Sequence, residues 1–413
     1  MTYRSRRRMR RRLCWACGVV LAGAGLLLIA GPSRVAADGC NTWSGPDSGG
    51  NWSLGSNWSS GQAPALGSPQ VLCFTPSGTL TTNDDISGLV VSSITVTTSA
   101  SDELVITGQS LAFSASSAAI TASATGGSGS ESIPAGSVVL ENPVVLQGAT
   151  TVSGYAVFTG MVSGPGTISV PDQGQAVLGP YPWTPSGAAN TFGSPGFVGV
   201  TVDTGGAAVV DNPGALGNGG VTVEQGGTLV MAGEESVSNP ISLAGSGLPN
   251  GTELSAGVYT AHGALDCEDQ ATVDGPITLT GDATIFTYLG CSLNGAITGP
   301  YQLTIAAGCG CESVIDGVST YSGGTILETA PGDSAASAGN QQNIDYVDGP
   351  GPLIRGWASP LGSGAVTVDA STALSTLSGA ATVGDVGSAG AVGYVHPGTV
   401  GVASRPPRSA WAA

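Results

Sequence analysis

The feature that most constrains this chain is a long series of short apolar runs, each closed by turn-forming residues. Residues 89–91, 138–140 and 221–223 are typical runs, and Gly, Pro or Asn-Gly separates one run from the next. No stretch keeps a 3.6-residue apolar period, so we expect strands and corners without crossover helices. The abundance of Val, Ile and Thr in these runs favours β-structure as well.

We predict from this pattern an all-β parallel β-helix, also called a β-solenoid. Coils of about 20 residues would each contribute two or three strands, paired with the coils above and below at about 4.8 Å. Inward positions would then stack Val on Val, and outward positions would carry Thr, Ser or Asp. A string of antiparallel β-sandwich modules is the alternative fold, which the scarcity of hairpin signals disfavours.

Internal repeats support coils of similar construction. Two motifs recur in the same order along the chain, Asn142-Pro143-Val144-Val145-Leu146 as Asn239-Pro240-Ile241-Ser242-Leu243 and Gly275-Pro276-Ile277-Thr278-Leu279, and Gly160-Met161-Val162-Ser163-Gly164-Pro165 as Gly295-Ala296-Ile297-Thr298-Gly299-Pro300. A third joins residues 216–223 to residues 361–368. The spacing between copies drifts, which places insertions in the corners, and we expect the polar, Gly-rich residues 332–351 to be such an insertion.

Residues 1–37 have the features of a signal peptide. Seven arginines lie within the first 12 residues, residues 13–30 are apolar, and Val35-Ala36-Ala37 offers small residues for cleavage after Ala37. The apolar stretch is also long enough for an uncleaved membrane anchor. We expect cleavage, an extracellular or cell-surface location and no membrane span in the mature chain. The choice between Sec and twin-arginine export stays open.

The charge of the mature chain excludes two classes of partner. The chain has no lysine, and cleavage after Ala37 leaves Arg355, Arg405 and Arg408 against 28 acidic residues, a net charge of 3 − 28 = −25. Binding to nucleic acid through phosphates requires Lys or Arg. Adhesion to anionic lipid requires the same cations. We therefore expect neither partner.

Six cysteines remain after cleavage, and an even number in an exported chain predicts disulfides. They are Cys40, Cys73, Cys267, Cys291, Cys309 and Cys311. The spacing does not give the pairing. Cys267 and Cys291 are separated by about one coil, so a bridge between neighbouring coils is one possibility. Cys309-Gly310-Cys311 does not have the spacing of a zinc site.

The mature chain divides into three predicted parts. Residues 38–78 form a Trp-rich N-terminal cap segment, residues 79–404 the β-helix repeat region, and residues 405–413 an irregular tail. Trp43, Trp52 and Trp58 would cover the apolar end of the stack, or would alternatively offer exposed rings for carbohydrate stacking. The tail, with Arg405-Pro406-Pro407-Arg408, suggests a shifted reading frame or a truncated gene.

The chain resembles the autotransporter-associated β-strand repeat proteins. The motifs that carry this resemblance are the Trp-rich opening with Thr42-Trp43-Ser44-Gly45, Asn51-Trp52-Ser53 and Asn57-Trp58-Ser59, then Ser319-Thr320-Tyr321-Ser322-Gly323-Gly324-Thr325, Asn190-Thr191-Phe192-Gly193, and residues 215–229. The resemblance implies a right-handed, passenger-like β-helix and no particular activity. The family's C-terminal translocator barrel has long alternating strands, a pattern that we do not find here.

Two acidic runs are the densest candidates for chemistry. Asn83-Asp84-Asp85 and Asp266-Cys267-Glu268-Asp269 are interpreted as solvated corners rather than as the carboxylate pair of a glycosidase. With Asp274, the second run also has oxygen ligands of the kind that Ca²⁺ prefers. A lyase base of the β-helix type would have to be Arg355, the only cation of the repeat region.

Two serine motifs lack catalytic partners in the sequence. Residues 46–50 and 332–335 look like nucleophile loops, but His262 and His396 stand in no matching context and are interpreted as surface or corner residues. We therefore assign no catalytic, cofactor-binding or metal-binding residue, and we expect no cofactor.

The sequence thus predicts a non-catalytic exported β-solenoid, a structural or adhesin-like component of the cell surface or the extracellular space. Its expected partners are cell-surface glycans or other surface proteins, and the oligomeric state stays open. The alternative is a secreted carbohydrate-binding or polysaccharide-degrading protein, with glycan hydrolase as the only enzyme class kept open.

Overall fold

The computed structural model describes most of the chain from residue 39 to residue 329. The described ranges are 39–99, 102–125, 136–179, 189–233, 235–249, 252–254, 259–268, 270–288, 290–307, 312–315, 317–329 and six short segments between 353 and 396. The predicted signal peptide, the predicted tail and the predicted insertion at 332–351 lie outside them. Within these ranges all regular secondary structure is β-strand apart from one 3-10 helix, η1 (Gly55–Asn57). No described helix is long and apolar enough to cross a membrane.

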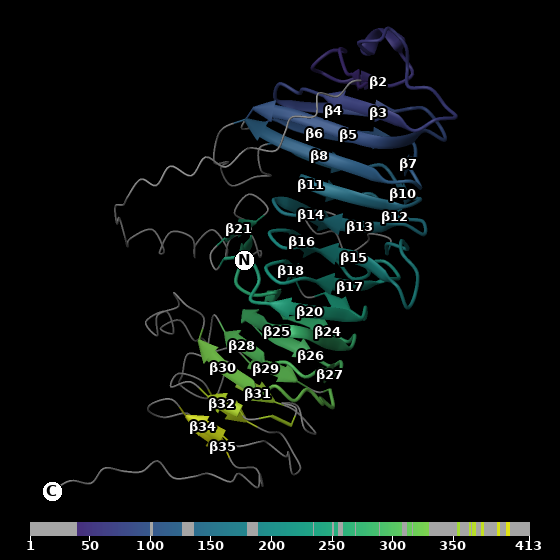
Figure 1. The fold of residues 1–413 in the computed structure, drawn as a ribbon. Coiled ribbons are helices and arrows are strands. Elements are labelled where there is room, and N and C mark those ends of the chain that lie inside the picture. Colours follow the sequence, from purple (N-terminus) through teal and green to yellow (C-terminus); the bar gives the residue numbers. More distant parts are fainter. Residues whose placement is uncertain are drawn as a thin grey trace, which may run out of the picture. The chain divides into compact units, whose positions relative to one another are not determined.

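Most strands belong to one large sheet of parallel pairings (Figure 1). The first strand line follows these pairings through β1 (Asn41–Thr42), β3 (Gln70–Phe74), β5 (Val90–Ser99), β8 (Ala118–Thr125), β11 (Ala149–Phe158), β13 (Thr167–Val170), β15 (Val198–Val202), β17 (Gly220–Val223), β20 (Ile241–Gly245), β25 (Ile277–Tyr288) and β27 (Ile297–Thr298).

The second strand line runs beside the first. It follows β2 (Gly50–Asn51), β4 (Thr79–Asp84), β6 (Glu103–Gly108), β9 (Ser137–Leu140), the end of β11, β14 (Gly174–Leu178), β16 (Ala207–Val210), β18 (Thr228–Met231), β23 (Leu265–Glu268), the end of β25, β28 (Leu303–Ala307), β30 (Thr325–Thr329), β32 (Val366–Val368) and β34 (Val386–Ser388).

The remaining strands occupy further sides of the coils. A short line contains β7 (Leu111–Phe113), β10 (Val144–Leu146) and β12 (Val162–Ser163). A separate parallel sheet contains β19 (Ser236–Val237), β24 (Ala271–Val273), β26 (Cys291–Leu293), β29 (Glu312–Ile315), β31 (Leu353–Arg355), β33 (Ala373–Ser375) and β35 (Tyr394–His396). One antiparallel hairpin joins β21 (Thr252–Leu254) to β22 (Tyr259–Ala261).

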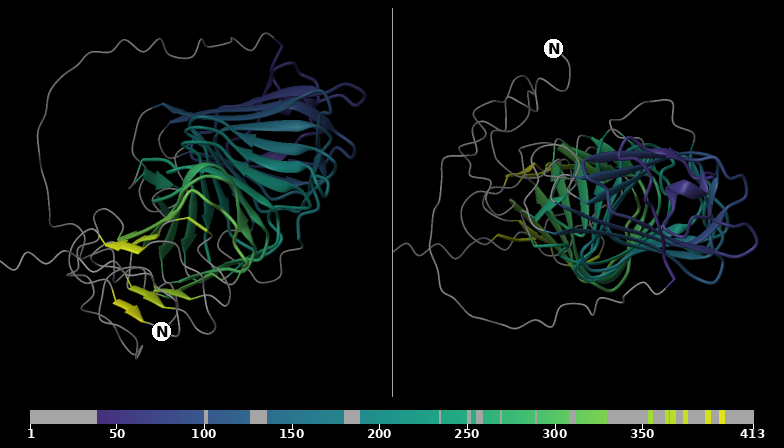
Figure 2. Two further views of the ribbon diagram at one scale, coloured as in Figure 1. Left: turned by 60° about the horizontal axis from the view of Figure 1, so that its bottom comes forward. Right: turned by 90° about the horizontal axis from the view of Figure 1, so that it is seen from above.

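Successive coils stack in register, as the sequence predicts. Ile277 pairs with Ile297, one coil of 20 residues later. Ile241 pairs with Ile277, 36 residues later, because the β21–β22 hairpin is inserted in that coil. Parallel strand lines around a shared interior are the arrangement expected of a β-solenoid, and the view from above in Figure 2 shows strands surrounding that interior. The all-β, parallel part of the prediction is therefore confirmed.

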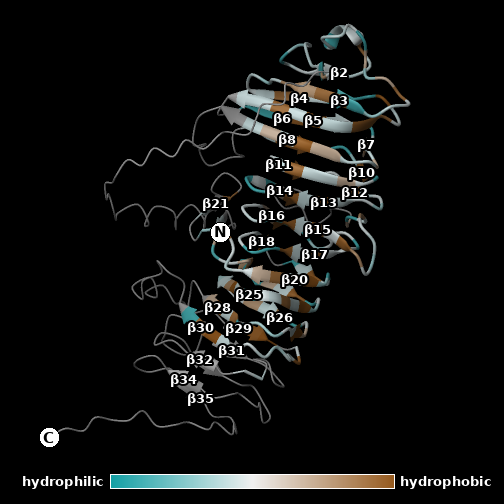
Figure 3. Cartoon of the chain, viewed as in Figure 1, coloured by the Kyte–Doolittle hydropathy of each residue, from teal (hydrophilic) through white to brown (hydrophobic). Residues whose placement is uncertain are grey.

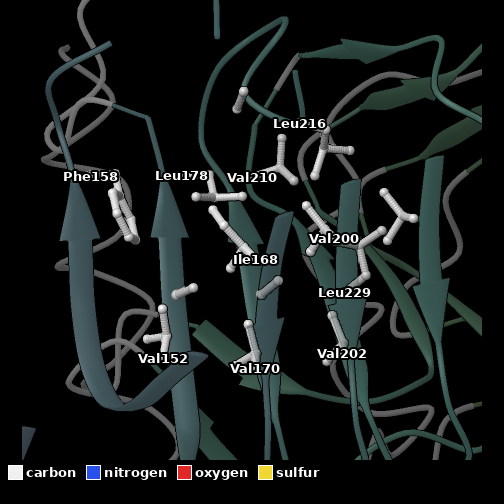
Figure 4. Close-up of a cluster of buried hydrophobic side chains, with 14 of the residues drawn as sticks. Val152, Phe158, Ile168, Val170, Leu178, Val200, Val202, Val210, Leu216 and Leu229 are labelled. Carbon is white, nitrogen blue, oxygen red and sulfur yellow. The ribbon is translucent and has the colours of Figure 1, made fainter. Parts of the chain in front are cut away.

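The interior is a continuous apolar core. Val170, Val202 and Val223 pair directly with one another in consecutive coils and are buried. Figure 4 shows such side chains pointing inward from neighbouring strands, and Figure 3 shows apolar residues recurring on successive strands. Because strand side chains alternate between faces, one face of each strand supplies this core. Full burial of one such side chain contributes about 1.5–3 kcal/mol, so the stack depends on many coils.

The same hydrogen-bonded corner occurs at both copies of the predicted second repeat. Asn190 Oδ1 accepts a hydrogen bond from the backbone N–H of Val162 at 2.8 Å. In the second copy, Ser319 Oγ accepts a hydrogen bond from the backbone N–H of Ile297 at 3.3 Å. The two copies nevertheless lie on different sides, because Val162 belongs to the β7–β10–β12 line and Ile297 to the first strand line. The repeat therefore marks a corner module rather than one fixed side of the coil.

Glycine is required where one corner lies directly on the next. A Cβ atom on Gly295 would lie 1.9 Å from the carbonyl oxygen of Gly275, and one on Gly317 would lie 2.1 Å from that of Gly295. No side chain fits at such a distance. This close backbone approach explains a Gly that recurs once per coil.

Candidate functional site

The tryptophans of the N-terminal segment are buried rather than displayed. Trp43, Trp52 and Trp58 are 7%, 0% and 2% exposed. Their rings meet each other edge to face at 5.4 and 5.8 Å and pack around Phe74 at 5.9–6.3 Å. The indole N–H of Trp58 donates a hydrogen bond to the carbonyl oxygen of Trp52 at 2.8 Å. These rings have no open face on which a sugar could stack.

A disulfide fixes this cluster to the first strand line. Cys40 is bonded to Cys73, which directly precedes Phe74, and the two Cα atoms lie 5.9 Å apart. Thr42 of β1 pairs with Cys73 of β3, so the bond crosses between two neighbouring parallel strands. The sequence predicted disulfides without a pairing, and the structure supplies this one.

Hydroxyl groups occupy one outward position of the first strand line over seven consecutive strands. This hydroxyl ladder consists of Thr151, Ser169, Thr201, Thr222, Ser242, Thr278 and Thr298. Each is partly or fully exposed, and the residues on either side of it are buried except for Gly299, as the alternation of a strand requires. The ladder therefore presents an uncharged, hydrogen-bonding surface to water.

An exposed aromatic ring precedes one strand of the hydroxyl ladder. Phe197 directly precedes β15 and is 72% exposed, the largest value among the large hydrophobic side chains described. Its carbonyl oxygen accepts a hydrogen bond from Gly220, at the start of β17. An exposed aromatic ring is the kind of surface on which a sugar ring can stack.

The equivalent outward position of the second strand line is apolar. This apolar ladder runs through Val105, Val139, Val157, Val177, Val209 and Val230, is interrupted by Asp266, and continues through Phe286 and Ala306. Leu254 and Ala261 of the β21–β22 hairpin belong to the same apolar cluster as Val209 and Val230. The hairpin thus packs as a second layer on the outside of the coils.

The interpretation of Asp266 as part of a solvated corner is wrong. Asp266 is fully buried in the apolar ladder, between Val230 and Phe286. One carboxylate oxygen accepts a hydrogen bond from the backbone N–H of His262 at 3.1 Å. Burial raises the pKa of Asp266 well above its usual range, and the neighbouring Glu268 raises it further. The side chain therefore favours its neutral form.

Another buried acid lies near Cys267, the residue that follows Asp266. Glu235, between β18 and β19, is 3% exposed, and its pKa is raised to about 7 chiefly by burial, with a further contribution from Asp211. The electrostatic influence of both Asp266 and Glu235 reaches Cys267. A carboxyl group with a pKa near 7 can exchange protons at neutral pH. We define Asp211, Glu235 and Asp266 as the buried acidic cluster.

His262 is not a simple surface residue either. It follows β22, and its ring stacks on that of Phe286, with 4.4 Å between the centroids. Burial lowers the pKa of its imidazole, which favours the neutral form. The chain beside it is held by the hydroxyl of Thr228, which donates a hydrogen bond to the carbonyl oxygen of Gly263 and accepts one from the N–H of Leu248.

The other acidic run is divided between the interior and the surface. Asp84 is buried, contrary to the prediction, and burial raises its pKa to about 7. Its carboxylate accepts a hydrogen bond from the N–H of Ile86, a local turn that positions the corner. Asp85 remains in the exposed corner and accepts hydrogen bonds from the backbone N–H and hydroxyl of Ser53.

The proposed calcium ligands are not assembled. Asp274 accepts hydrogen bonds from Ser236 and Asn294 at 2.5 and 2.7 Å, which lower its pKa, whereas Asp266 lies in the apolar ladder. Across the residues that the structure describes, no group of three His, Cys, Asp or Glu side chains is arranged to hold a metal ion.

The remaining sequence candidates also stay apart. Residues 46–50 form a turn in which Gly49 donates a hydrogen bond to the carbonyl oxygen of Pro46. Arg355 ends β31 and His396 ends β35, in the separate sheet, so His396 is not in a corner. The second serine motif, residues 332–335, lies outside the described residues.

Cys267 and Cys291 lie next to each other in the interior. Both are buried in the main apolar core, and their thiols are in hydrogen-bonding contact. Cys267 pairs with Thr287, and Cys291 follows four residues later in the same coil as Thr287. The two residues therefore belong to neighbouring coils, as their spacing suggested.

Comparisons of the chain with protein-family models, with curated proteins and with solved structures give no match.

Proposed function

We propose that this protein is an exported, non-catalytic β-solenoid that serves as a structural or adhesive component of the cell surface or the extracellular space. The observation that carries the proposal is the register of the first strand line, in which seven consecutive strands keep apolar residues inside and a hydroxyl outside. Such a surface is hydrated without positive charge, and its repeated geometry suits extended contacts with another polymer.

The corner modules support kinship with the autotransporter-associated repeat proteins and, with it, a right-handed coil. Asn190-Thr191-Phe192 and Ser319-Thr320-Tyr321 carry the resemblance in sequence. In each, the first residue bonds to the coil before it and the aromatic side chain is fully buried. The motif is thus explained by packing, which agrees with a family defined by structure rather than by a reaction.

The N-terminal segment suits the role of a cap. An open parallel stack exposes unpaired backbone groups and apolar residues at its end. The rings of Trp43, Trp52 and Trp58, with the Cys40–Cys73 bond, place a compact, cross-linked cluster on the first coils. This arrangement would protect the terminal strands from pairing with another chain.

A second candidate, a secreted carbohydrate-binding protein, is favoured by Phe197. Its exposed ring directly precedes the strand that carries Thr201, so the same strand offers a stacking surface and a hydroxyl group. The buried tryptophans and the buried acidic cluster do not contribute to such a surface. The polysaccharide-degrading form of this candidate has less support, because Asp84 and Asp266 are both buried.

A glycan array and a reducing-sugar assay on the purified mature chain, residues 38–413, separate the two candidates. A structural role predicts no hydrolysis and no glycan whose binding depends on Phe197. Binding that is lost in Phe197→Ala but kept in Leu66→Ala, an exposed hydrophobic residue outside the ladder, would replace the structural proposal with the carbohydrate-binding one.

Fractionation of cells that express the full chain tests export. We expect the chain outside the cytoplasm and shortened by residues 1–37, as N-terminal sequencing of the product would show. A full-length product that remains in the cytoplasm would overturn the proposed location.

A further inference from the structure

The two thiols of Cys267 and Cys291 occupy a position that suits a covalent link between coils. Cys267 faces inward near the end of β23, and Cys291 faces inward at the start of β26 in the next coil. Ala271 of the lower coil pairs with Cys291 of the upper coil. A bond between the two sulfur atoms would therefore join successive windings across a corner, inside the core.

A pair of free thiols would be the alternative, since a buried cysteine often acts only as a small apolar side chain. Two features argue against it here. The thiols are already in contact, so a bond requires little rearrangement of their neighbours. The chain also forms a disulfide elsewhere, between Cys40 and Cys73, and disulfides persist in oxidising compartments.

We infer that Cys267 and Cys291 form a second disulfide in the exported protein, which locks two coils of the solenoid together beside the buried acidic cluster. This inference rests on the proposed export. In the reaction, the thiols lose two protons and two electrons as the sulfur–sulfur bond forms. A dithiol–disulfide exchange protein of the export compartment accepts the electrons, and its own disulfide becomes a dithiol.

The surroundings of the pair determine when the bond can form. The thiolate is the reactive species, and the hydrogen bond with Cys291, together with burial, raises the pKa of Cys267. A folded, reduced protein would therefore oxidise slowly, because its thiols are both hidden and protonated. The bond should form while the coils are still assembling, before β26 closes over β23.

Peptide mapping of the exported full chain tests the inference. The protein is denatured in N-ethylmaleimide without reductant and cut with endoproteinase Asp-N and chymotrypsin. Cleavage after Tyr301 separates Cys291 from Cys309 and Cys311. We expect a peptide that links Cys267 to Cys291, two hydrogens lighter than its reduced parts, and no maleimide on either residue.

The Cys40–Cys73 bond is the internal control for an oxidising environment. If Cys40 and Cys73 are bonded while Cys267 and Cys291 carry maleimide, or are bonded to Cys309 or Cys311, the inference is overturned although export holds. If all of them carry maleimide in a cytoplasmic product, export has failed. The chain is then refolded in a glutathione redox buffer, and the Cys40–Cys73 and Cys267–Cys291 bonds are mapped again. This experiment tests the cross-link without depending on export.

Thermal unfolding provides an independent measurement. We expect reductant to lower the unfolding midpoint of a Cys40→Ala/Cys73→Ala variant by several degrees, because the second bond is still present to be reduced. The same reductant should leave a variant with all four residues replaced by Ala unchanged. Equal behaviour of the two variants would contradict a Cys267–Cys291 bond.

Discussion

The outer surfaces of the two main strand lines differ, although their inner surfaces are alike. Both lines direct Val, Ile and Leu into one core. On the outside, the first line carries the hydroxyl ladder and meets water, whereas the second carries the apolar ladder, on part of which the β21–β22 hairpin packs. The inward residues therefore cause the coils to stack, and the outward residues decide whether another layer packs on them.

The largest difference between the ladders should appear when a charge is placed in each. Val209→Asp would put a carboxylate into the apolar ladder at a position with 0% exposure, and an unpaired buried charge costs about 4 kcal/mol. Urea unfolding followed by circular dichroism would measure the loss. A variant as stable as the parent would show that the hairpin does not exclude water there.

A smaller effect is expected from pH, through the buried carboxyl groups. Glu235 has a pKa raised to about 7 from 4.5 by burial. The contribution of Glu235 to the free energy of unfolding is therefore fully present below pH 4.5 and is lost as pH rises through about 7. The shift corresponds to about 3 kcal/mol at 1.36 kcal/mol per unit.

Urea midpoints from pH 5 to pH 8 would measure this pH dependence. Glu235→Gln should flatten the profile, and Asp266→Asn should flatten it further because the pKa of Asp266 is raised as well. The matched control is Asp274→Asn, whose carboxyl lies outside the cluster with a lowered pKa. A parent profile that stays flat between pH 5 and pH 8 would contradict the role of the cluster.

Truncation within the hairpin should affect the second layer more than the coils. Leu254→Ala removes a buried side chain from the apolar cluster, at a cost of roughly 2 kcal/mol. Hydrogen exchange should accelerate in β21 and β22 and stay slow in β17, which belongs to the first strand line. Equal acceleration in β17 would mean that the hairpin and the coils unfold as one unit.

The smallest effect is expected on the hydroxyl ladder. Thr222→Asp places a charge at a position that already meets water, so the free energy of unfolding should change by less than about 0.5 kcal/mol. The same urea titration would measure it alongside Val209→Asp. A loss similar to that of Val209→Asp would indicate that an unrecognised layer covers the first strand line.

The sequence predicted the coil better than it predicted the surroundings of individual acids. Short runs such as residues 221–223 marked the strands correctly, because burial on one face leaves a direct trace in the residue pattern. Asp84 and Asp266 were interpreted as solvated because each lies in a dense acidic run, and acidic residues are rarely buried. Their burial depends on residues far along the chain, which local patterns do not reveal.

The repeats show the same limit of local patterns. The motif at Gly160–Pro165 and its copy at Gly295–Pro300 form equivalent corners, yet they lie on different strand lines. A corner is specified by a few neighbouring residues, through turn chemistry and close backbone approach. The side on which it lies depends on how many residues the intervening insertions add to each coil.

By itself, the sequence determined that this protein is built from parallel β-coils of about 20 residues with an apolar interior, since alternation and turn residues act over short distances. Tertiary structure alone decided which cysteines meet, which acids are buried and which outer face gains a second layer. These outcomes depend on register between coils, because a residue's neighbours in a parallel stack come from 18 to 41 positions away along the chain.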